Sequence, residues 1–400
     1  MKILVLNAGS SSHKLCLYVV GDNLPEQAPT ASWEAQIDWY PGKAAVELKT
    51  ESGTTLEKTF SITSRGDILF QVLSTLWQGT IQVLNSPKEI DVVGHRVVHG
   101  GRTYRTSTLV TPAVKAEIDR LRSLAPNHNP ANLEGIELME ALLEDTPQVA
   151  VFDTAFHSSM ADVAAIYPGP YDWVDQDIRR YGFHGISHQY CSQRAAQILG
   201  QEDLRLVICH LGNGGSLCAV RDGQSIDTTM GFTPLEGLMM GTRSGSIDPG
   251  ILIHLMRQGY SADELDKLLN KESGLKGISG LSHDLRHIKQ AITTGNPRAQ
   301  LARDSYLHRL KACMGSMLMS LGGTDAIVFT AGIGENDASI RADVCEAMDF
   351  LGLKLDVDKN KTHPVDQDIA LPDSTIRVLV IHTQEDWAIA QDCWHSLKPC

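Results

Sequence analysis

Apolar runs separated by small-residue turns predict a pair of strands near the start of each half of the chain. Residues 3–6 are apolar, residues 7–12 form a turn rich in Gly and Ser, and residues 14–18 are largely apolar again. The same order recurs over residues 206–220, where the turn is at 212–216. Each copy predicts a strand, a tight turn and a returning strand. The recurrence after about half of the chain predicts two related halves.

Other segments alternate between strand and helix patterns. A third apolar run at 326–330 passes through the Gly-rich residues 331–336 into a helix with Ile340, Val344 and Ala347 on one face. Residues 21–60 are mixed and polar with weak hairpin character, and residues 228–250 predict a loop. The remaining expected elements are a helix at 112–125 with Thr111 as its cap and Pro112 in its first turn, a buried strand at 149–152, helices at 251–270 and 297–321, and a strand at 377–381 followed by a short helix. Alternating strands and helices predict an α/β architecture.

Composition narrows the function classes. The chain has 400 residues, 42% of them hydrophobic, and these can bury two substantial cores. A net charge of −13 argues against a general attraction for nucleic acid or anionic membranes. Eight cysteines without a C-x-x-C pair fit reduced thiols in a cytoplasmic protein. The four-residue apolar run at the start is too short for a signal-peptide core, and no segment approaches a membrane span.

The Gly-rich turns predict a phosphate site. Successive backbone N–H groups in such a turn form a concave anion site, and glycine permits the close approach. Either turn alone is equally consistent with a tight hairpin. Two matching turns and the third at 331–336 favour a nucleotide. The chain has no G-x-x-x-x-G-K-[ST] motif, and its Gly-x-Gly turns lack the third glycine of a dinucleotide fingerprint, so the phosphate site is of another kind.

Seven motifs then carry a resemblance to a known family. They are residues 7–12, 94–101, 151–157, 181–185, 210–214, 230–243 and 329–336. Together they resemble the acetate kinase family from residue 1 to about 390. The resemblance implies a duplicated actin-like (ribonuclease H-like) ATPase fold with ATP in a cleft between two domains. The expected domains are residues 1–152 with about 386–400, and residues 153–385. It also implies the reversible reaction ATP + acetate ⇌ ADP + acetyl phosphate with Mg²⁺, or alternatively Mn²⁺.

Phosphoryl transfer to a carboxylate needs positioning and charge neutralisation. Acetate is ionised at pH 7, so no base is required to activate it. Arg96 is the candidate to bind the substrate carboxylate with its planar fork of donors. Arg243 lies between small residues that let a phosphate come close, and His184 can donate a hydrogen bond to the transferring group. The resemblance gives Arg243 and His184 this stabilising role.

Three further residues are expected near a metal. The resemblance assigns Asn7 and Glu385 to Mg²⁺, and both are hard oxygen donors of the kind that Mg²⁺ accepts. It gives Asp153 an acid/base role. Because the acceptor is already ionised, we prefer Asp153 as an organiser of a metal-bound water or of a neighbouring cation. The segment 384–386 reads Gln-Glu-Asp where the family usually has Asn-Glu-Glu.

The family correspondence also supplies the remaining binding residues. For the nucleotide they are Lys14, Ser10, Ser12, His210, Leu211, Gly212, Asn213, Gly214, Asp284, Leu285, Arg286, Gly332, Ile333, Gly334, Glu335 and Asn336. For the methyl group of acetate they are Val98, Asn127, Phe183 and Pro234. Asn127 stands where the family usually has leucine, so the preference among acetate, propionate and larger acids stays open.

Alternative functions remain at this stage. They are a propionate or other short-chain carboxylic acid kinase, a sugar or glycerol kinase on the same fold, and a non-enzymatic actin-like ATPase. Arg96 favours an anionic acceptor over an alcohol. Only fifteen residues follow Glu385, which leaves no room for an appended peptide-binding domain. We expect a cytoplasmic homodimer that binds acetate and acetyl phosphate, but neither nucleic acid nor membrane.

Overall fold

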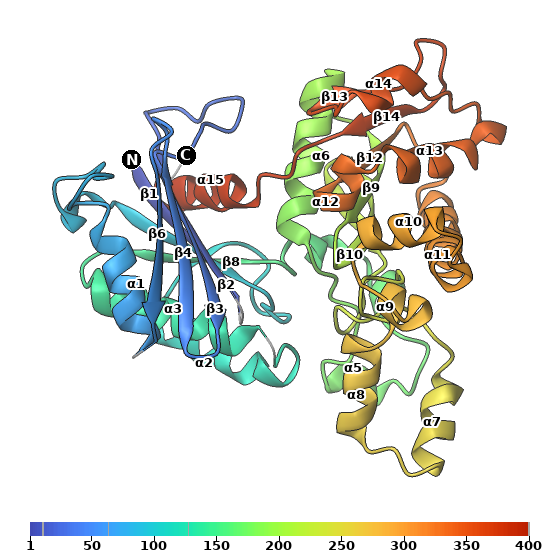
Figure 1. The fold of residues 1–400 in the computed structure, drawn as a ribbon, viewed down its shortest axis with the longest axis horizontal. Helices are drawn as coiled ribbons and strands as arrows, with labels where there is room; N and C mark the ends of the chain where they lie inside the picture. The colour runs from blue at the N-terminus through green and yellow to red at the C-terminus, as the bar shows by residue number, and fades with distance from the viewer. Residues whose placement is uncertain (10–11, 63, 127, 399–400) are drawn as a thin grey trace. The chain divides into compact units, whose positions relative to one another are not determined.

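Each half of the chain builds its own β-sheet, as the repeated strand pattern predicts (Figure 1). The computed structural model describes residues 1–9, 12–62, 64–126 and 128–398. Contacts divide the chain into two units, which we describe separately. Unit 1 is Met1–Ala155 with Gln384–Cys400, and unit 2 is Phe156–Thr383.

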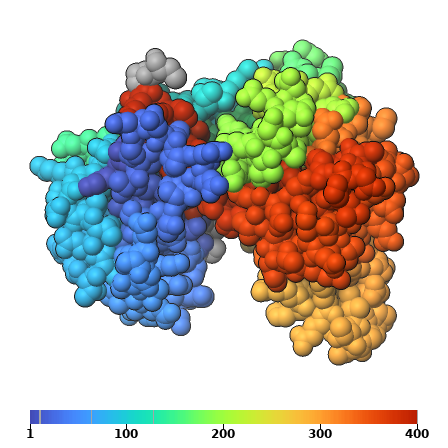
Figure 2. Space-filling model, turned by 90° about the horizontal axis from the view of Figure 1, so that it is seen from above, coloured from blue at the N-terminus to red at the C-terminus, as the bar shows by residue number. Residues whose placement is uncertain are grey.

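Unit 1 combines the N-terminal strands with the last helix of the chain. Figure 2 shows the red C-terminal end lying against the blue N-terminal segments. The strands of unit 1 are β1 (Lys2–Ala8), β2 (Ser12–Val19), β3 (Trp33–Tyr40), β4 (Lys43–Thr50), β5 (Thr55–Ser61), β6 (Val92–Val97), β7 (Thr108–Leu109) and β8 (Gln148–Phe152). Its helices are α1 (Arg65–Ser74), η1 (Pro87–Glu89), α2 (Pro112–Arg120), η2 (Leu121–Ser123), α3 (Asn129–Leu142) and α15 (Glu385–Leu397).

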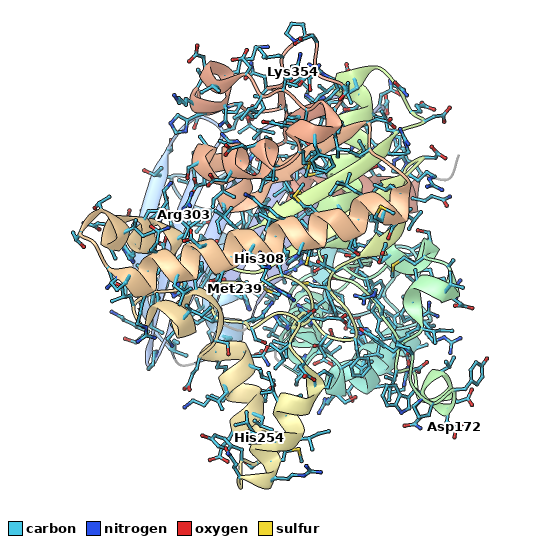
Figure 3. All side chains as sticks on the ribbon, turned by 90° about the vertical axis from the view of Figure 1, so that its right-hand side faces the viewer. Asp172, Met239, His254, Arg303, His308 and Lys354 are labelled. Carbon is cyan, nitrogen blue, oxygen red and sulfur yellow. The ribbon has the colours of Figure 1, made fainter. Side chains whose placement is uncertain are left out.

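Unit 2 has a smaller sheet and more helices, of which α11 is the longest (Figure 3). Its strands are β9 (Arg205–Leu211), β10 (Gly215–Arg221), β11 (Gln224–Thr228), β12 (Ala326–Thr330), β13 (Gln367–Asp368) and β14 (Arg377–Val380). Its helices are η3 (Phe156–Ser159), α4 (Asp162–Ala165), α5 (Asp172–Asp175), α6 (Gly185–Leu199), α7 (Pro249–Arg257), α8 (Ala262–Lys271), α9 (Gly274–Ser279), α10 (Leu285–Thr293), α11 (Pro297–Leu321), α12 (Ala331–Asn336), α13 (Ala338–Glu346), η4 (Asp349–Leu351) and α14 (Val357–Lys361).

The two sheets share one topology. In unit 1 the order β3-β2-β1-β6-β8 forms the centre of the sheet, and in unit 2 the order is β11-β10-β9-β12-β14. In unit 1, β1 pairs antiparallel with β2 and parallel with β6, and β6 pairs parallel with β8. In unit 2, β9 pairs antiparallel with β10 and parallel with β12, and β12 pairs parallel with β14. This repeated order confirms the predicted α/β fold with two related halves. Because the carboxyl ends of the parallel strands meet at one edge of each sheet, the turns that follow β1 and β9 occupy equivalent places.

Most predicted elements are present, with some different limits. The Thr111 hydroxyl accepts a hydrogen bond from the backbone N–H of Val114 at 3.3 Å, so it caps α2 as expected. That helix ends at Arg120, and the 3₁₀ turn η2 continues the predicted span to Ser123. Residues 251–270 form two helices, α7 and α8, because Gly259 with φ 99° breaks the first and Ser261 caps the second. Helix α11 has the predicted limits.

Residues 21–60 hold more strand than their sequence indicates. Three antiparallel strands, β3, β4 and β5, extend the sheet of unit 1 beyond β2. In β5 every residue is at least partly exposed, so polar side chains break the apolar pattern that identifies a strand. Across the described residues, no helix is long and apolar enough to cross a membrane.

The two faces of the unit 1 sheet are covered by different helices. Leu4 and Leu6 of β1 belong to a core that also contains side chains of α1 and α3. On β6, Gly94 approaches α15 so closely that a Cβ atom there would lie 2.5 Å from Cys393 Sγ and 2.7 Å from Ile389 Cγ2. The absence of a side chain at residue 94 therefore allows the C-terminal helix to pack on the sheet.

We expect Gly94→Ala to lower the free energy of unfolding by about 1–3 kcal/mol, because the added methyl group would displace α15 from β6. Urea unfolding followed by circular dichroism measures this. Gly21→Ala is the matched control, since Gly21 is exposed and has no atom within 4 Å of the added Cβ. Equal stability of the two variants would contradict this view of the α15 packing.

Candidate active site

A cavity of about 730 Å³ in unit 2 collects many of the predicted nucleotide residues. It lies among the turn after β9, the start of α10 and the helix α12 that follows β12. The predicted residues that line it are Gly212, Asn213, Asp284, Leu285, Arg286, Gly332, Ile333 and Asn336. Three segments that are far apart in the sequence thus meet around one space large enough for a small-molecule ligand.

The Gly-rich turn after β9 is held by the loop that the sequence predicts at residues 228–250. Within the turn, the Gly212 N–H donates to the Gly214 carbonyl at 2.9 Å, and the Gly241 N–H donates to the Asn213 carbonyl at 3.0 Å. A Cβ at Gly241 would lie 2.2 Å from Asn213 Oδ1, so a side chain at residue 241 would force the Asn213 side chain to move. The loop therefore brings Arg243, two residues later, to the Gly-rich turn.

Arg243 and His184 lie on one side of this turn. A Cβ atom built on Gly214 would be 3.5 Å from Arg243 Nη1 and 3.8 Å from His184 Nε2. Arg243 Nη1 donates to the Pro234 carbonyl at 3.2 Å, and no carboxylate among the described residues forms an ion pair with it. Burial lowers the pKa of the Arg243 guanidinium, which still remains charged near neutral pH. The structure thus presents a partly buried cation next to a turn suited to phosphate.

The backbone and neighbours of His184 fix its ring. His184 precedes α6 in the left-handed region with φ 59°, a conformation that is uncommon for residues other than glycine. Its ring stacks on the ring of His210 with 4.1 Å between centroids. Its Nδ1 lies 2.9 Å from Ser216 Oγ, so the other ring nitrogen is the one near Gly214 and Arg243.

In unit 1, Arg96 and Asp153 form a buried ion pair. Arg96 Nη2 lies 2.5 Å from Asp153 Oδ2, and Arg96 Nη1 donates to Asn7 Oδ1 at 3.4 Å. These three residues stand at the ends of β6, β8 and β1, which are neighbours in the sheet. Burial opposes the charge of Arg96, but the carboxylates of Asp153, Glu385 and Asp386 together outweigh this effect and raise its pKa. Asp153 is 1% exposed.

The acidic side chains of unit 1 suit a divalent cation. Asp153 Oδ1 is buried and has no hydrogen-bond partner among the described residues. Burial raises the pKa of Glu385 to about 7, and the Asp153 charge adds to this effect while Arg96 opposes it. An added cation would satisfy the unpartnered oxygen and favour the ionised Glu385. The described part of the chain holds no cluster of three or more His, Cys, Asp or Glu arranged for a metal. Mg²⁺ needs only one or two protein carboxylates beside water and phosphate, so Asn7 and Glu385 fit it.

Other predicted residues have different surroundings. Lys14 Nζ pairs with Asp386 at 2.6 Å, and the Ser12 carbonyl accepts a hydrogen bond from Gly9 N–H. The Glu335 carboxylate accepts from the N–H groups of Ala331 and Thr383 and contacts His382, so it does not line the cavity. The remaining residues are Val98 in unit 1 and Phe183, Pro234, His210, Leu211, Gly214 and Gly334 in unit 2. Ser10 and Asn127 lie outside the described residues.

Comparison with known proteins adds independent findings. A profile of the acetokinase family matches residues 2–391. The acetate kinase of Acaryochloris marina is 68% identical over 397 residues, which cover 99% of this chain and 100% of that protein. The acetate kinase of Trichormus variabilis is 62% identical, with 100% of both chains covered.

Solved structures are similar over the whole chain. The crystal structure of Porphyromonas gingivalis acetate kinase has a TM-score of 0.90 at 40% identity, covering 99% of this chain and 100% of that one. A propionate kinase from Francisella tularensis has a TM-score of 0.89 at 38% identity, with 98% of each chain covered.

The chain belongs to the acetokinase family. It is therefore a phosphotransferase, and its membership of the family implies the use of ATP and ADP. Its fold is that of the acetate and propionate kinases.

Three cavity residues of this acetokinase were not predicted from its sequence. They are His283, Lys289 and Asp337. Lys289 Nζ bonds to both oxygens of Asp337, at 3.0 and 3.2 Å, and so links α10 to the start of α13. Asp337 directly follows α12, the short helix that residues 331–336 form where the sequence predicted a Gly-rich turn. Lys289 lies four residues, or one helical turn, after Leu285 of the predicted nucleotide segment, and this helical spacing would have been the sequence signal for it.

Buried histidines make the stability of the chain depend on pH. Burial lowers the pKa of His157 to about 4 and that of His188 well below its ordinary value. The pKa is also lowered to about 4 by burial in unit 1, at His13, His95 and His99. Below about pH 6.5 the unfolded chain binds protons that the folded chain rejects, so stability is complete above that pH and is lost toward pH 4.

We expect the free energy of unfolding to fall between pH 6.5 and 4, with each such histidine contributing up to about 1.4 kcal/mol per pH unit. Urea titrations at several pH values measure the slope. His157→Asn should reduce it. His254→Asn should not, since His254 is exposed on α7 (Figure 3). A stability that stays constant over this range would contradict the prediction.

Proposed function

We propose that the chain transfers the γ-phosphoryl group of ATP to the carboxylate of acetate and forms acetyl phosphate and ADP. The observation that carries this proposal is the partly buried Arg243 cation, which has no carboxylate partner among the described residues and lies beside the Gly-rich turn, as His184 does. The names of the curated relatives at 62–68% identity support acetate as the acceptor.

The nucleotide is proposed to occupy the cavity of unit 2. Its phosphates would lie at the N–H groups of the 212–214 turn, because glycine backbone can approach an anion closely. Its base and ribose would contact the cavity walls formed by residues 284–286 and by Gly332, Ile333 and Asn336. Ser12 and Lys14 of unit 1 are also proposed for the phosphates, and the resemblance of the 7–14 turn to the family supports this.

His184 and Arg243 are proposed to stabilise the transferring phosphoryl group. In a loose transition state the charge spreads over three equatorial oxygens, which the guanidinium and the imidazole N–H can bind. Fixed donors of this kind lower the barrier because they need no rearrangement as the charge develops.

Arg96 is proposed to bind the carboxylate of acetate. The acceptor oxygen is already anionic at neutral pH, so no residue has to remove a proton from it. Asp153 then acts by holding Arg96, to which it is hydrogen-bonded, and not as a base. Val98, Asn127, Phe183 and Pro234 are proposed for the methyl group, and support for them comes from the family correspondence.

Asn7 and Glu385 are proposed to hold Mg²⁺, with Asp153 Oδ1 available to a metal-bound water. Bound Mg²⁺ would neutralise phosphate charge during transfer. We also propose that the two units act as the two predicted domains and that the protein is a cytoplasmic homodimer. These last proposals are supported by the family resemblance alone.

A hydroxylamine-trapping assay tests the proposed reaction. With purified protein, ATP and MgCl₂, we expect acetate to give a hydroxamate at the highest rate. Propionate should follow within about tenfold, because one buried methylene changes binding by only ~0.8 kcal/mol. A higher rate with propionate would move the assignment toward the named activity of the Francisella relative. ATP consumption with glycerol, without hydroxamate from any acid, would contradict the proposal.

Arg96→Ala tests the acceptor site in the same assay. We expect the KM for acetate to rise at least tenfold with less than a threefold change in the KM for ATP, since a buried charge-assisted hydrogen bond is worth about 1.5–3 kcal/mol. Arg120→Ala is the matched control, because Arg120 is a surface arginine on α2 whose partner is Glu117. Equal rises in both KM values would remove Arg96 from the acceptor site.

A further inference from the structure

Ser216 joins two histidines of unit 2. Its hydroxyl oxygen lies 2.9 Å from His184 Nδ1 and 2.7 Å from His188 Nε2. Ser216 is on β10, while His184 precedes α6 and His188 is one turn into it. Ser216 and His188 are both 0% exposed, so no solvent hydrogen bond competes with these contacts.

The number of available hydrogens restricts the direction of the hydrogen bonds that link His188, Ser216 and His184. A serine hydroxyl has one hydrogen and two lone pairs. If it accepted from both histidines, its own buried O–H would have no acceptor among the described contacts of Ser216, so it donates to one histidine and accepts from the other. Burial lowers the pKa of His188 well below its ordinary value, so its ring is neutral and carries one N–H. Two arrangements remain, and they differ in which His184 nitrogen carries the proton.

The surroundings of His188 favour one arrangement. His188 Nδ1 is buried and has no hydrogen-bond partner among the described residues. If Nε2 accepted from Ser216, the proton of His188 would be on Nδ1, which would leave a buried N–H without an acceptor. Such orphaned donors are rare in folded proteins. With the proton on Nε2, His188 donates to Ser216 Oγ, and the Ser216 hydroxyl donates to His184 Nδ1.

We propose that Ser216 and His188 are positioning residues that fix His184 as the tautomer with its proton on Nε2. In this series of hydrogen bonds, His188 Nε2–H donates to Ser216 Oγ, and the Ser216 hydroxyl donates to His184 Nδ1. This inference deepens the proposed function and rests on it, because His184 needs an N–H directed at the transferring phosphoryl group. The opposite tautomer would present a lone pair to an anion and would oppose catalysis.

A second contact fixes the plane of the same ring. The rings of His184 and His210 are stacked with an angle of 17° between them. His210 is itself held, since its Nδ1 lies 2.8 Å from Ser187 Oγ, which lies 2.9 Å from Thr383 Oγ1. Stacking sets the ring plane and Ser216 sets the rotation and the proton, so the position of Nε2 is fixed, 3.8 Å from a Cβ atom built on Gly214.

The tautomer can be read directly by ¹⁵N NMR of histidine-labelled protein at pH 8 without substrate. The His184 signals are assigned by their loss in His184→Asn. We expect a protonated Nε2 and a bare, hydrogen-bonded Nδ1 in the wild type. In Ser216→Ala we expect mixed tautomers or a proton on Nδ1. A wild-type His184 with its proton on Nδ1 would overturn the proposal, and this measurement needs no folded Ser216 variant.

Kinetics provide the second test. Ser216→Ala should lower kcat by about 10–100-fold with the KM values for ATP and acetate changed less than threefold, as for other residues that orient a reacting group. Ser225→Ala is the matched control. Ser225 is equally buried and bonds to His157 Nδ1 at 2.8 Å, but it does not contact His184. We expect its kcat to stay within twofold. Equal kcat values for the two variants would overturn the proposal.

The two readouts separate this inference from the proposed function. If the wild type gave no hydroxamate with any acid, the proposed function would fail while the His184 tautomer would still be measured. If hydroxamate formed and Ser216→Ala retained both the wild-type tautomer and the wild-type kcat, only the positioning role would be lost.

Discussion

The chemistry of unit 2 depends on holding the partly buried guanidinium of Arg243 without a carboxylate partner among the described residues. Arg243 is held by the Pro234 carbonyl and by a loop that the Gly241–Asn213 contact fixes to the Gly-rich turn. A buried charge of this kind is unfavourable in the absence of a counter-charge. The fold therefore holds Arg243 in a position where binding an anion would be favourable. The packing of β9, β10 and the helices around them stabilises the fold enough to tolerate this unfavourable free energy.

Arg96 of unit 1 and Arg243 of unit 2 differ in their ion pairing. In unit 1 the charge of Arg96 is balanced by Asp153, and Asp153 Oδ1 still has no hydrogen-bond partner in the described part of the chain. In unit 2 no carboxylate among the described residues pairs with Arg243. A balanced arginine can exchange contacts with a small carboxylate substrate, while an unbalanced one suits a group whose charge is larger, such as phosphoryl. The proposed division of roles follows from this difference.

Much of the fold could be predicted because it depends on local patterns. The strand–turn–strand repeat identified β1–β2 and β9–β10, and a capping threonine and a proline located the start of α2. The strands at 33–61 were predicted only as weak hairpin character. The edge strand β5 has no buried residue, so its apolar pattern is broken, whereas β3 and β4 do alternate buried and more exposed positions. The break between α7 and α8 depends on Gly259, whose positive φ the periodicity does not reveal.

The site was predictable where residue type determines the chemistry. Arg96, His184 and Arg243 were chosen for their ability to bind anions, and their roles remain proposals. Lys289 and Asp337 were missed because each lies just beyond a motif and reaches the cavity only through tertiary packing. The bridge that Ser216 makes between two histidines depends on the left-handed backbone at His184, which sequence alone does not indicate.

The central claim is that the Arg243 charge is reserved for the transferring phosphoryl group. It is tested most directly by calorimetric binding of ATP, and of ADP with aluminium fluoride, Mg²⁺ and acetate, to the wild type and to Arg243→Ala. The account predicts that the variant binds ATP within about threefold of the wild type and binds the planar phosphoryl mimic at least a hundredfold more weakly. An equal loss of affinity for both ligands would place Arg243 in ground-state nucleotide binding and would contradict the account.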